Sequence, residues 1–358
     1  MEENMQKITV MILPVGTTCN LTCRYCYHGE PSVDRGEIKV MPFDILGKVI
    51  SQSKPLAMDI DFLWHGGEPL LAGMDFYSEA LNFQKLTNFS GKARNVVQTN
   101  GTLINAGMAK FLADNYFFVG VSLDGPKEIH DGNRFNCVGS GSFEKVIKGI
   151  ENLRFSGRFV GAVAVVTRTN VTCPDEVYRA LKNSGAKTCA FHLYSRSSLN
   201  SFDLFPKDED ACSFFKRVFD LWIGEDDPDF MVRNFRNVLR VLFGGKALDC
   251  ASNHNHCRRF IAIVPNGDVY PCHRFVGMEK FLLGNVQDNP LHEIYKRGAS
   301  VYDNMASIPE SCFSCNWFKA CGGGCAYERL AANNSFFGKH PECEIKRELF
   351  SYIEKSIK

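Results

Sequence analysis

The chain has 358 residues, of which 45% are hydrophobic, and a formal net charge of +1 at pH 7. This length and composition predict a folded protein with one large α/β domain and a smaller second one, and exclude a disordered chain. The balanced charge argues against nucleic acid or a membrane surface as a partner bound through bulk charge. No apolar run approaches the roughly 20 residues of a membrane span, and the polar N-terminus is not a signal peptide, so we expect a cytoplasmic protein.

Short apolar runs alternate with amphipathic stretches over the first two thirds of the chain. The apolar runs predict strands at residues 9–15, 60–64, 95–99, 118–123, 160–166 and 189–194. Helical patterns lie between and after them at residues 44–52, 76–86, 106–114, 143–153, 175–183 and 209–222. Six βα units in sequence predict a parallel sheet, either a barrel or an open doubly wound sheet. In both folds the loops at the carboxyl ends of the strands bind ligands, so we expect these loops to converge.

The pattern changes near residue 231. A predicted helix at 232–243 ends at Gly244-Gly245, and a hairpin follows at 260–264 and 269–271 around Asn266-Gly267. The remainder is rich in cysteine and ends in a predicted helix at 343–357. We therefore predict two domains, 1–235 and 236–358.

Fifteen cysteines in a cytoplasmic chain point to metal or redox chemistry, because disulfides are disfavoured there. Three of them, in the spacing Cys19-x3-Cys23-x2-Cys26, lie in the loop after the first predicted strand. Three thiolates this close can bind three irons of a 4Fe–4S cluster and leave the fourth iron open to a ligand. A zinc site completed by His28 is the alternative.

This spacing, with Tyr25 before the third cysteine, resembles the signature of the radical S-adenosylmethionine (SAM) superfamily. Gly66-Gly67-Glu68-Pro69, at the end of the second predicted strand, resembles that superfamily's motif for the SAM amino group. The chemistry fits, since glycines allow close approach and a carboxylate pairs with an ammonium. The resemblance implies a partial (β/α)6 TIM barrel in which SAM is cleaved reductively to a 5′-deoxyadenosyl radical.

Further segments match in order, namely Gln98-Thr99-Asn100-Gly101, Ser122-Leu123-Asp124-Gly125 and His130-Asp131-x2-Arg134. They resemble the segments through which peptide-modifying members of the superfamily hold SAM. The resemblance implies that Ser122 and Arg134 contact the SAM carboxylate and Asn100 the ribose, while Tyr25 and Leu193 pack against the adenine. Strand-end caps or core residues are the alternative for each.

The C-terminal cysteines resemble those of the SPASM domain, an auxiliary-cluster module of radical SAM enzymes. By this resemblance one 4Fe–4S cluster uses Cys250, Cys257, Cys272 and Cys325, and another uses Cys312, Cys315, Cys321 and Cys343, which makes three clusters in all. A pair of zinc ribbons is the alternative. Most of the other four cysteines (Cys137, Cys173, Cys189 and Cys212) are expected to be small buried hydrophobes, with Cys137 the exception to watch.

The residue after Cys272 bears on the reaction. Sulfatase-maturating enzymes have an aspartate there, thought to be a base, whereas this chain has His273 in a run, Pro271 to Gly277, that resembles peptide cross-linking maturases. His273 is a candidate base, or a hydrogen-bonding residue beside a cluster. We therefore expect formation of a thioether or carbon–carbon cross-link in a ribosomally made peptide.

Two other functions stay open from the sequence. One is an anaerobic sulfatase maturase that forms formylglycine from Cys or Ser, and the other is a zinc-binding or electron-transfer module. The expected partners are a precursor peptide or protein substrate and a flavodoxin or ferredoxin reductant. Because few residues precede the first predicted strand, we expect no fused leader-binding domain.

Overall fold

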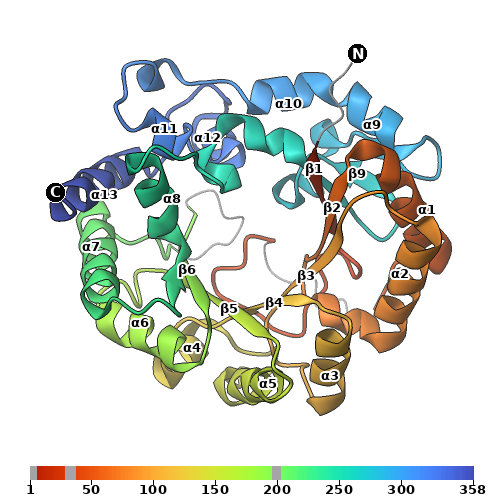
Figure 1. Cartoon of the computed structure of the whole chain (residues 1–358), viewed down its shortest axis with the longest axis horizontal. Coiled ribbons are helices and arrows are strands. Elements are labelled where there is room, and N and C mark those ends of the chain that lie inside the picture. The colour runs from red at the N-terminus through yellow and green to blue at the C-terminus, as the bar shows by residue number, and fades with distance from the viewer. Residues whose placement is uncertain (1–5, 29–37, 196–202) are drawn as a thin grey trace.

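Six parallel strands lie side by side in chain order in the computed structural model, which describes residues 6–28, 38–195 and 203–358 (Figure 1). They are β1 (Lys7–Ile12), β2 (Asp59–Trp64), β3 (Ala93–Thr99), β4 (Phe118–Ser122), β5 (Phe159–Val166) and β6 (Thr188–Leu193). The helices that connect them ring the outside of the curved sheet (Figure 1). Sequential strand order with helices on one face is that of a partial (β/α)6 barrel, as the family resemblance implied, and not of a doubly wound sheet.

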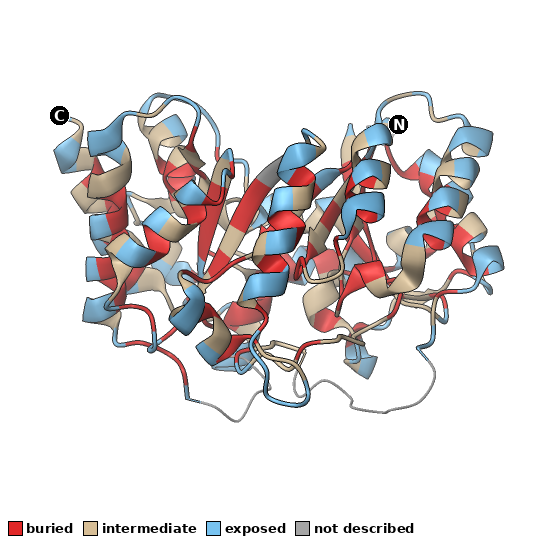
Figure 2. Ribbon diagram, turned by 90° about the horizontal axis from the view of Figure 1, so that it is seen from below, coloured by how far each residue is buried: buried red, intermediate tan, exposed pale blue. Residues whose placement is uncertain are grey.

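The helices of the barrel follow the strands as expected, except that the short helix at Lys127–Asn133 was not predicted. They are α1 (Phe43–Ser53), α2 (Gly73–Thr87), α3 (Ala106–Asp114), α4 (Lys127–Asn133), α5 (Phe143–Phe155), α6 (Pro174–Asn183) and α7 (Asp208–Glu225). Figure 2 shows buried residues on the strands and the inward faces of the helices, with exposed residues on their outward faces. In β2, for example, Trp64 packs edge-on against Phe76 and Tyr77 of α2. Burial of such large aromatic side chains is the main force that holds helix to sheet.

The opposite face of the sheet is less completely buried. In β2 the burial alternates strictly, so that Ile60, Phe62 and Trp64 are buried while the residues between them are only partly so. Gln98 and Ser122 lie at such half-buried positions of β3 and β4, and the Gln98 amide donates to the Ser122 hydroxyl at 3.3 Å. The inner face therefore offers polar groups and space, which a ligand-binding barrel needs.

The cysteine-rich region continues the same sheet. Strand β8 (Phe260–Ile263) pairs in parallel with β1, β9 (Asp268–Tyr270) folds back on β8, and β10 (Gly284–Asn285) pairs with β9. At the other end of the sheet, β7 (Met231–Val232) pairs with β6. The remaining helices are α8 (Arg233–Leu242), α9 (Leu291–Arg297), α10 (Ala299–Met305), α11 (Phe318–Cys321), α12 (Ala326–Asn333) and α13 (Cys343–Ser356). The domain division at residue 235 falls inside α8 and stays a prediction.

Within the described residues, no helix is both long and apolar enough to cross a membrane.

Candidate functional site

The loops at the carboxyl ends of β1 to β4 converge, as the sequence predicted. The loop after β2 is tied to the one after β1 by two backbone hydrogen bonds, Gly67 N–H to the Gly16 oxygen at 3.0 Å and Glu68 N–H to the Thr18 oxygen at 2.9 Å. A Cβ atom on Gly67 would lie only 2.0 Å from that Thr18 oxygen. The glycine therefore allows the Gly-Gly-Glu-Pro loop to touch the backbone that leads into Cys19.

Glu68 is fully buried, and its carboxylate joins the loops after β2 and β3. It accepts hydrogen bonds from the backbone N–H of Leu70 at 3.0 Å, the Thr99 hydroxyl at 2.8 Å and the backbone N–H of Asn100 at 2.7 Å. Burial nevertheless raises the pKa of Glu68 to about 7, because these donors offset only part of the cost of removing a charge from water. A nearby ammonium group would restore the charged form, which fits the predicted role. Pro69 begins the following turn, and its carbonyl accepts from Tyr77.

The three N-terminal thiols, the cysteine triad of Cys19, Cys23 and Cys26, lie close together. Burial raises the pKa of Cys23 to about 12, and Cys19 and Cys26 are near enough to raise it further through their charges. Burial likewise raises the pKa of Cys19 to about 11, followed by the effect of Glu68. Desolvated thiols that crowd one another gain most from a metal centre that binds them as thiolates. The triad therefore fits an iron–sulfur cluster, and its role as a ligand set remains a prediction.

A buried ion pair between Asp124 and Arg134 follows β4, and Tyr25 of the loop after β1 is hydrogen-bonded to it. The Asp124 carboxylate receives the Tyr25 hydroxyl, the Nε of Arg134 at 3.1 Å and the backbone N–H of Val165 at 3.1 Å. The Arg134 guanidinium also lies over the Tyr25 ring, 5.2 Å from its centre. Burial alone would lower the pKa of Arg134, but the carboxylate beside it raises that pKa above its usual value. Sequence reasoning missed this role of Asp124, although it quoted the segment.

Replacing Arg134 with methionine should destabilise the fold by about 3–5 kcal/mol, because it leaves the Asp124 carboxylate buried without its partner. The free energy of unfolding from a denaturant titration measures this. Lys110→Met is the matched control, since its ion pair with Asp114 is exposed and is worth under about 1 kcal/mol. Equal losses in the two variants would contradict the structural importance of the buried pair.

The other predicted SAM contacts lie around this centre. The Asn100 side chain donates to the oxygen of Asn20 at 2.8 Å and to the Cys19 sulfur at 3.7 Å, so it borders the triad. Ser122 is half-buried on the inner face of β4. Leu193 is buried at the end of β6 and packs in the hydrophobic core. Their contacts with SAM stay predictions.

Electrostatic interactions among the C-terminal thiols follow the two predicted ligand sets, which stay a prediction. Cys250 is exposed, yet its thiol interacts electrostatically with Cys257, Cys272 and Cys325, and we call these four the first quartet. Cys312 interacts in the same way with Cys315 and Cys321, and Cys343 interacts with Cys312 and Cys321; these are the second quartet. All fifteen cysteines lie in the described part of the chain and each is a free thiol. Eight thiols in two groups suit two further iron–sulfur clusters.

A buried arginine that the sequence did not reveal lies between the quartets. Arg329 of α12 is completely buried, and its guanidinium donates to the carbonyl oxygens of Met305 at 2.9 Å and Ser307 at 2.8 Å. Burial lowers its pKa, whereas thiols from both quartets counteract that effect. A fixed cation between two anionic centres would stabilise both of them.

A cluster of ring and cationic side chains lies where the triad loop, the Gly66 loop and the Cys272 loop meet. This histidine group consists of Tyr27, His28, His65, His273 and Arg274. The rings of His65 and His273 stack with centres 4.8 Å apart, and Tyr27 contacts His273 edge-on at 5.5 Å. Tyr27 Oη, His28 Nε2 and Arg274 Nη1 are buried and make no hydrogen bond to the described residues. The sequence singled out His273 and, as an alternative zinc ligand, His28, whereas Tyr27, His65 and Arg274 follow no spacing rule.

Of the four cysteines outside these sets, Cys189 and Cys212 are buried as expected, Cys173 is half-buried and Cys137 is exposed.

Comparisons with known proteins agree with this site. Residues 13–181 match the family model of the radical SAM superfamily, and residues 255–316 match that of the SPASM iron–sulfur cluster-binding domain. The fold and the site thus define a radical SAM enzyme with a C-terminal iron–sulfur domain. The chain is 32% identical, over 97% of its length and 96% of the relative's, to a cysteine-type anaerobic sulfatase-maturating enzyme of Clostridium perfringens. The chain belongs to the family of these enzymes.

Two further comparisons cover almost the same extent. A serine-type anaerobic sulfatase-maturating enzyme of Bacteroides thetaiotaomicron is 33% identical over 90% of this chain and 83% of its own. The solved structure of native anSMEcpe with bound AdoMet superimposes with a TM-score of 0.88 at 30% identity, covering 98% of both chains. The same protein has also been solved with AdoMet and the Cp18Cys peptide.

Proposed function

We propose that this enzyme oxidises the side chain of a cysteine or serine in a polypeptide substrate by two electrons, as a sulfatase maturase does. The observation that carries the proposal is the match, over nearly the whole chain, to both cysteine-type and serine-type maturases. The preference for a cross-link that we drew from His273 and its neighbours gives way to this match. One altered residue weighs less than similarity over nearly the whole chain and fold.

The cofactors are SAM and, in our proposal, three 4Fe–4S clusters, held by the triad and the two quartets. When bound, they would supply a radical that removes a hydrogen atom and an acceptor for the remaining electron. The chain's own residues do the rest. Glu68 binds the SAM ammonium, the Asp124–Arg134 pair fixes the loop beside the triad, and the histidine group holds the substrate.

The oxidation releases one proton, which a side chain of the enzyme must accept. A side chain of the form –CH2–SH or –CH2–OH loses a hydrogen atom from carbon, a proton from sulfur or oxygen, and one electron, which leaves a C=S or C=O bond. Water then converts the thioaldehyde to the aldehyde and releases hydrogen sulfide. His273 is our candidate to receive the proton, because its imidazole lies beside the Cys272 sulfur and can offer a lone pair.

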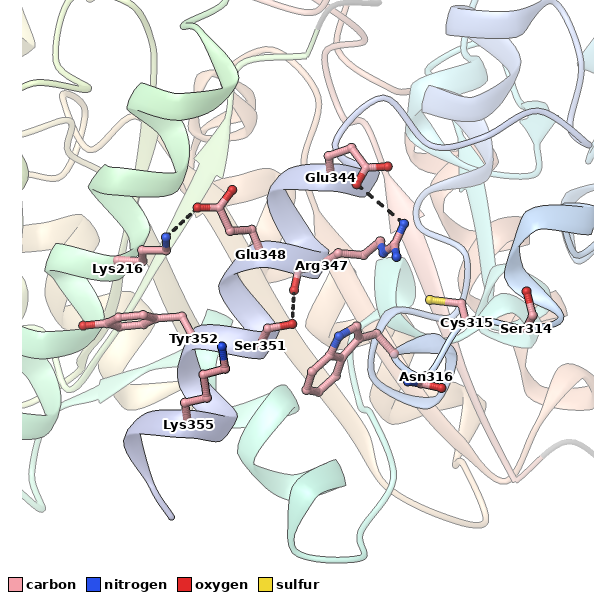
Figure 3. A pocket seen from close by; sticks show the side chains of 11 residues that line it. Lys216, Ser314, Cys315, Asn316, Glu344, Arg347, Glu348, Ser351, Tyr352 and Lys355 are labelled. Atoms are coloured by element: carbon pink, nitrogen blue, oxygen red, sulfur yellow. Dashed lines mark hydrogen bonds and ion pairs between the residues drawn. The ribbon is translucent and has the colours of Figure 1, made fainter.

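We infer that the electron carrier docks beside the second quartet. A hollow of about 620 Å³ lies between α13 and the Cys315 loop. Figure 3 shows Lys216, Arg347 and Lys355 among the residues that line it. Its two carboxylates are already paired, Glu348 with Lys216 at 2.5 Å and Glu344 with Arg347 at 3.6 Å. Among the described residues, these pairs leave Lys355 as the one lining cation without a carboxylate, and an acidic partner such as a flavodoxin or ferredoxin complements it.

Lys355→Glu should therefore weaken flavodoxin binding to the reconstituted enzyme by about tenfold at low salt, since a close like charge replaces an attractive one. Isothermal titration at two salt concentrations measures this. Lys110→Glu on α3, the same charge change far from the hollow along the chain, is the control. Unchanged binding in Lys355→Glu would place the carrier elsewhere.

Anaerobic reconstitution followed by peptide turnover tests the proposed function. With SAM and dithionite, the Cp18Cys peptide and its serine version should each gain an aldehyde that reacts with hydrazine. Loss of two hydrogens without an aldehyde would instead indicate a cross-link. The iron content should be about twelve atoms per chain for three clusters. Zinc in place of iron, or no 5′-deoxyadenosine, would leave only the binding-module alternative.

A further inference from the structure

The tautomer of His65 follows from one hydrogen bond. The backbone N–H of Gly66 donates to His65 Nδ1 at 2.7 Å, so this nitrogen carries no proton. Burial lowers the pKa of His65 to about 3, which keeps the ring neutral at physiological pH. A neutral imidazole has one N–H, and it is therefore at Nε2. His65 therefore has its hydrogen-bond donor at Nε2.

His273 presents the opposite polarity. Its Nδ1 lies 3.5 Å from the Cys272 sulfur. In our proposed function Cys272 is a cluster ligand and hence a thiolate, which can only accept a hydrogen bond, and this role places the proton of His273 at Nδ1. The Nε2 atom of His273 then carries a lone pair and accepts.

The two rings stack at 4.8 Å with an angle of 29° between their planes. Stacked rings do not hydrogen-bond to each other, so the donor of one does not satisfy the acceptor of the other. A hydroxyl or thiol is the smallest group that accepts one hydrogen bond and donates another. A methyl group at the same place would satisfy neither nitrogen.

We propose that His65 is a substrate-binding residue that donates a hydrogen bond from Nε2 to the oxygen or sulfur of the side chain being oxidised, while His273 accepts from the same group. This assignment rests on the proposed function and deepens it. His65 selects a reacting residue with a hydroxyl or thiol over an aliphatic one, and it orients that group so that the proton points at His273.

Peptide binding without turnover tests this. The full chain, with its clusters reconstituted and S-adenosylhomocysteine in place of SAM, is titrated with the Cp18Cys peptide and with a version in which alanine replaces its cysteine. The wild type should prefer the cysteine peptide by about tenfold, the size of one or two good hydrogen bonds. His65→Phe keeps the stacked ring but has no donor, and the preference should fall to about twofold or less. His65→Gln retains an N–H and should keep most of it.

The control is His292→Phe, the same change on α9, which should bind both peptides like the wild type. Iron content and S-adenosylhomocysteine binding are measured for every variant, and His65→Leu replaces His65→Phe if the larger ring prevents assembly. An undiminished preference in the variant without a donor overturns the proposal, as does loss of the preference in His65→Gln. Because nothing reacts in this assay, its failure is distinct from failure of the wild type to form an aldehyde, which would overturn the proposed function instead.

Discussion

Replacing Cys23 with alanine should abolish SAM cleavage and lower the iron content by about four atoms per chain. Cys23 lies among the other two thiols of the triad, and burial raises its pKa to about 12. Two thiols cannot hold three irons of a cluster, so the loss of one ligand removes the whole centre. Iron analysis, together with 5′-deoxyadenosine release in the presence of dithionite, measures both effects.

Cys137→Ala is the matched control. This thiol is exposed and belongs to neither the triad nor the quartets, so iron content and SAM cleavage should stay at wild-type levels. Alanine at Cys257, in the first quartet, should also remove about four irons but leave the triad intact. A Cys23→Ala chain that still releases 5′-deoxyadenosine at the wild-type rate would show that the triad is not the reducing centre.

The sequence predicted the barrel well because its strands and longer helices have strong periodicity. The helix at residues 106–114 was predicted to the residue, and it is capped by Asn105, whose side chain accepts from the Met108 N–H. Short elements such as α9 and α11 escaped prediction, since four to seven residues complete at most two helical turns. The first strand was predicted too close to the C-terminus, at residues 9–15 instead of Lys7–Ile12. Leu13 and Val15 misled the prediction, because they are apolar and buried although they lie in the loop after the strand.

The site shows a sharper division. Cysteines and the Gly-Gly-Glu-Pro loop were visible in the sequence because their spacing is local. The partners that complete the site come from distant segments, as with Tyr25 and Asp124, which are 99 residues apart. The pairing of His65 with His273 is a product of the fold alone, because the hairpin of β8 and β9 joins the sheet beside β1. Such long-range contacts leave no pattern within a single sequence.

The electrostatics of Glu68 predict a characteristic pH dependence. Its pKa is about 7 in the folded chain because of burial, against an ordinary value of 4.5. A raised carboxyl pKa means that the folded state holds the proton more tightly than the unfolded state. In the absence of SAM, the stability contributed by neutral Glu68 is fully present below pH 4.5 and is lost as the pH rises through 7, by about 3 kcal/mol for a difference of 2.5 units. Glu68→Gln should abolish this fall in the free energy of unfolding.

Binding of SAM should depend on pH in the opposite direction over the same range. The carboxylate of Glu68 forms as the pH rises through 7, whereas an α-amino group loses its charge above about pH 8, so affinity should be highest between these two values. Glu68→Gln should weaken SAM binding by about 100-fold, since a charge-assisted hydrogen bond in a buried site becomes a neutral one. Its affinity should no longer rise between pH 6 and pH 7, because glutamine does not titrate.

Equilibrium binding of SAM to the reconstituted chain across this range measures both effects, with Glu79→Gln on α2 as the control. If SAM affinity still rose between pH 6 and pH 7 in Glu68→Gln, the titrating group would be another residue. An unchanged affinity at pH 7.5 would show that Glu68 is not in the SAM site.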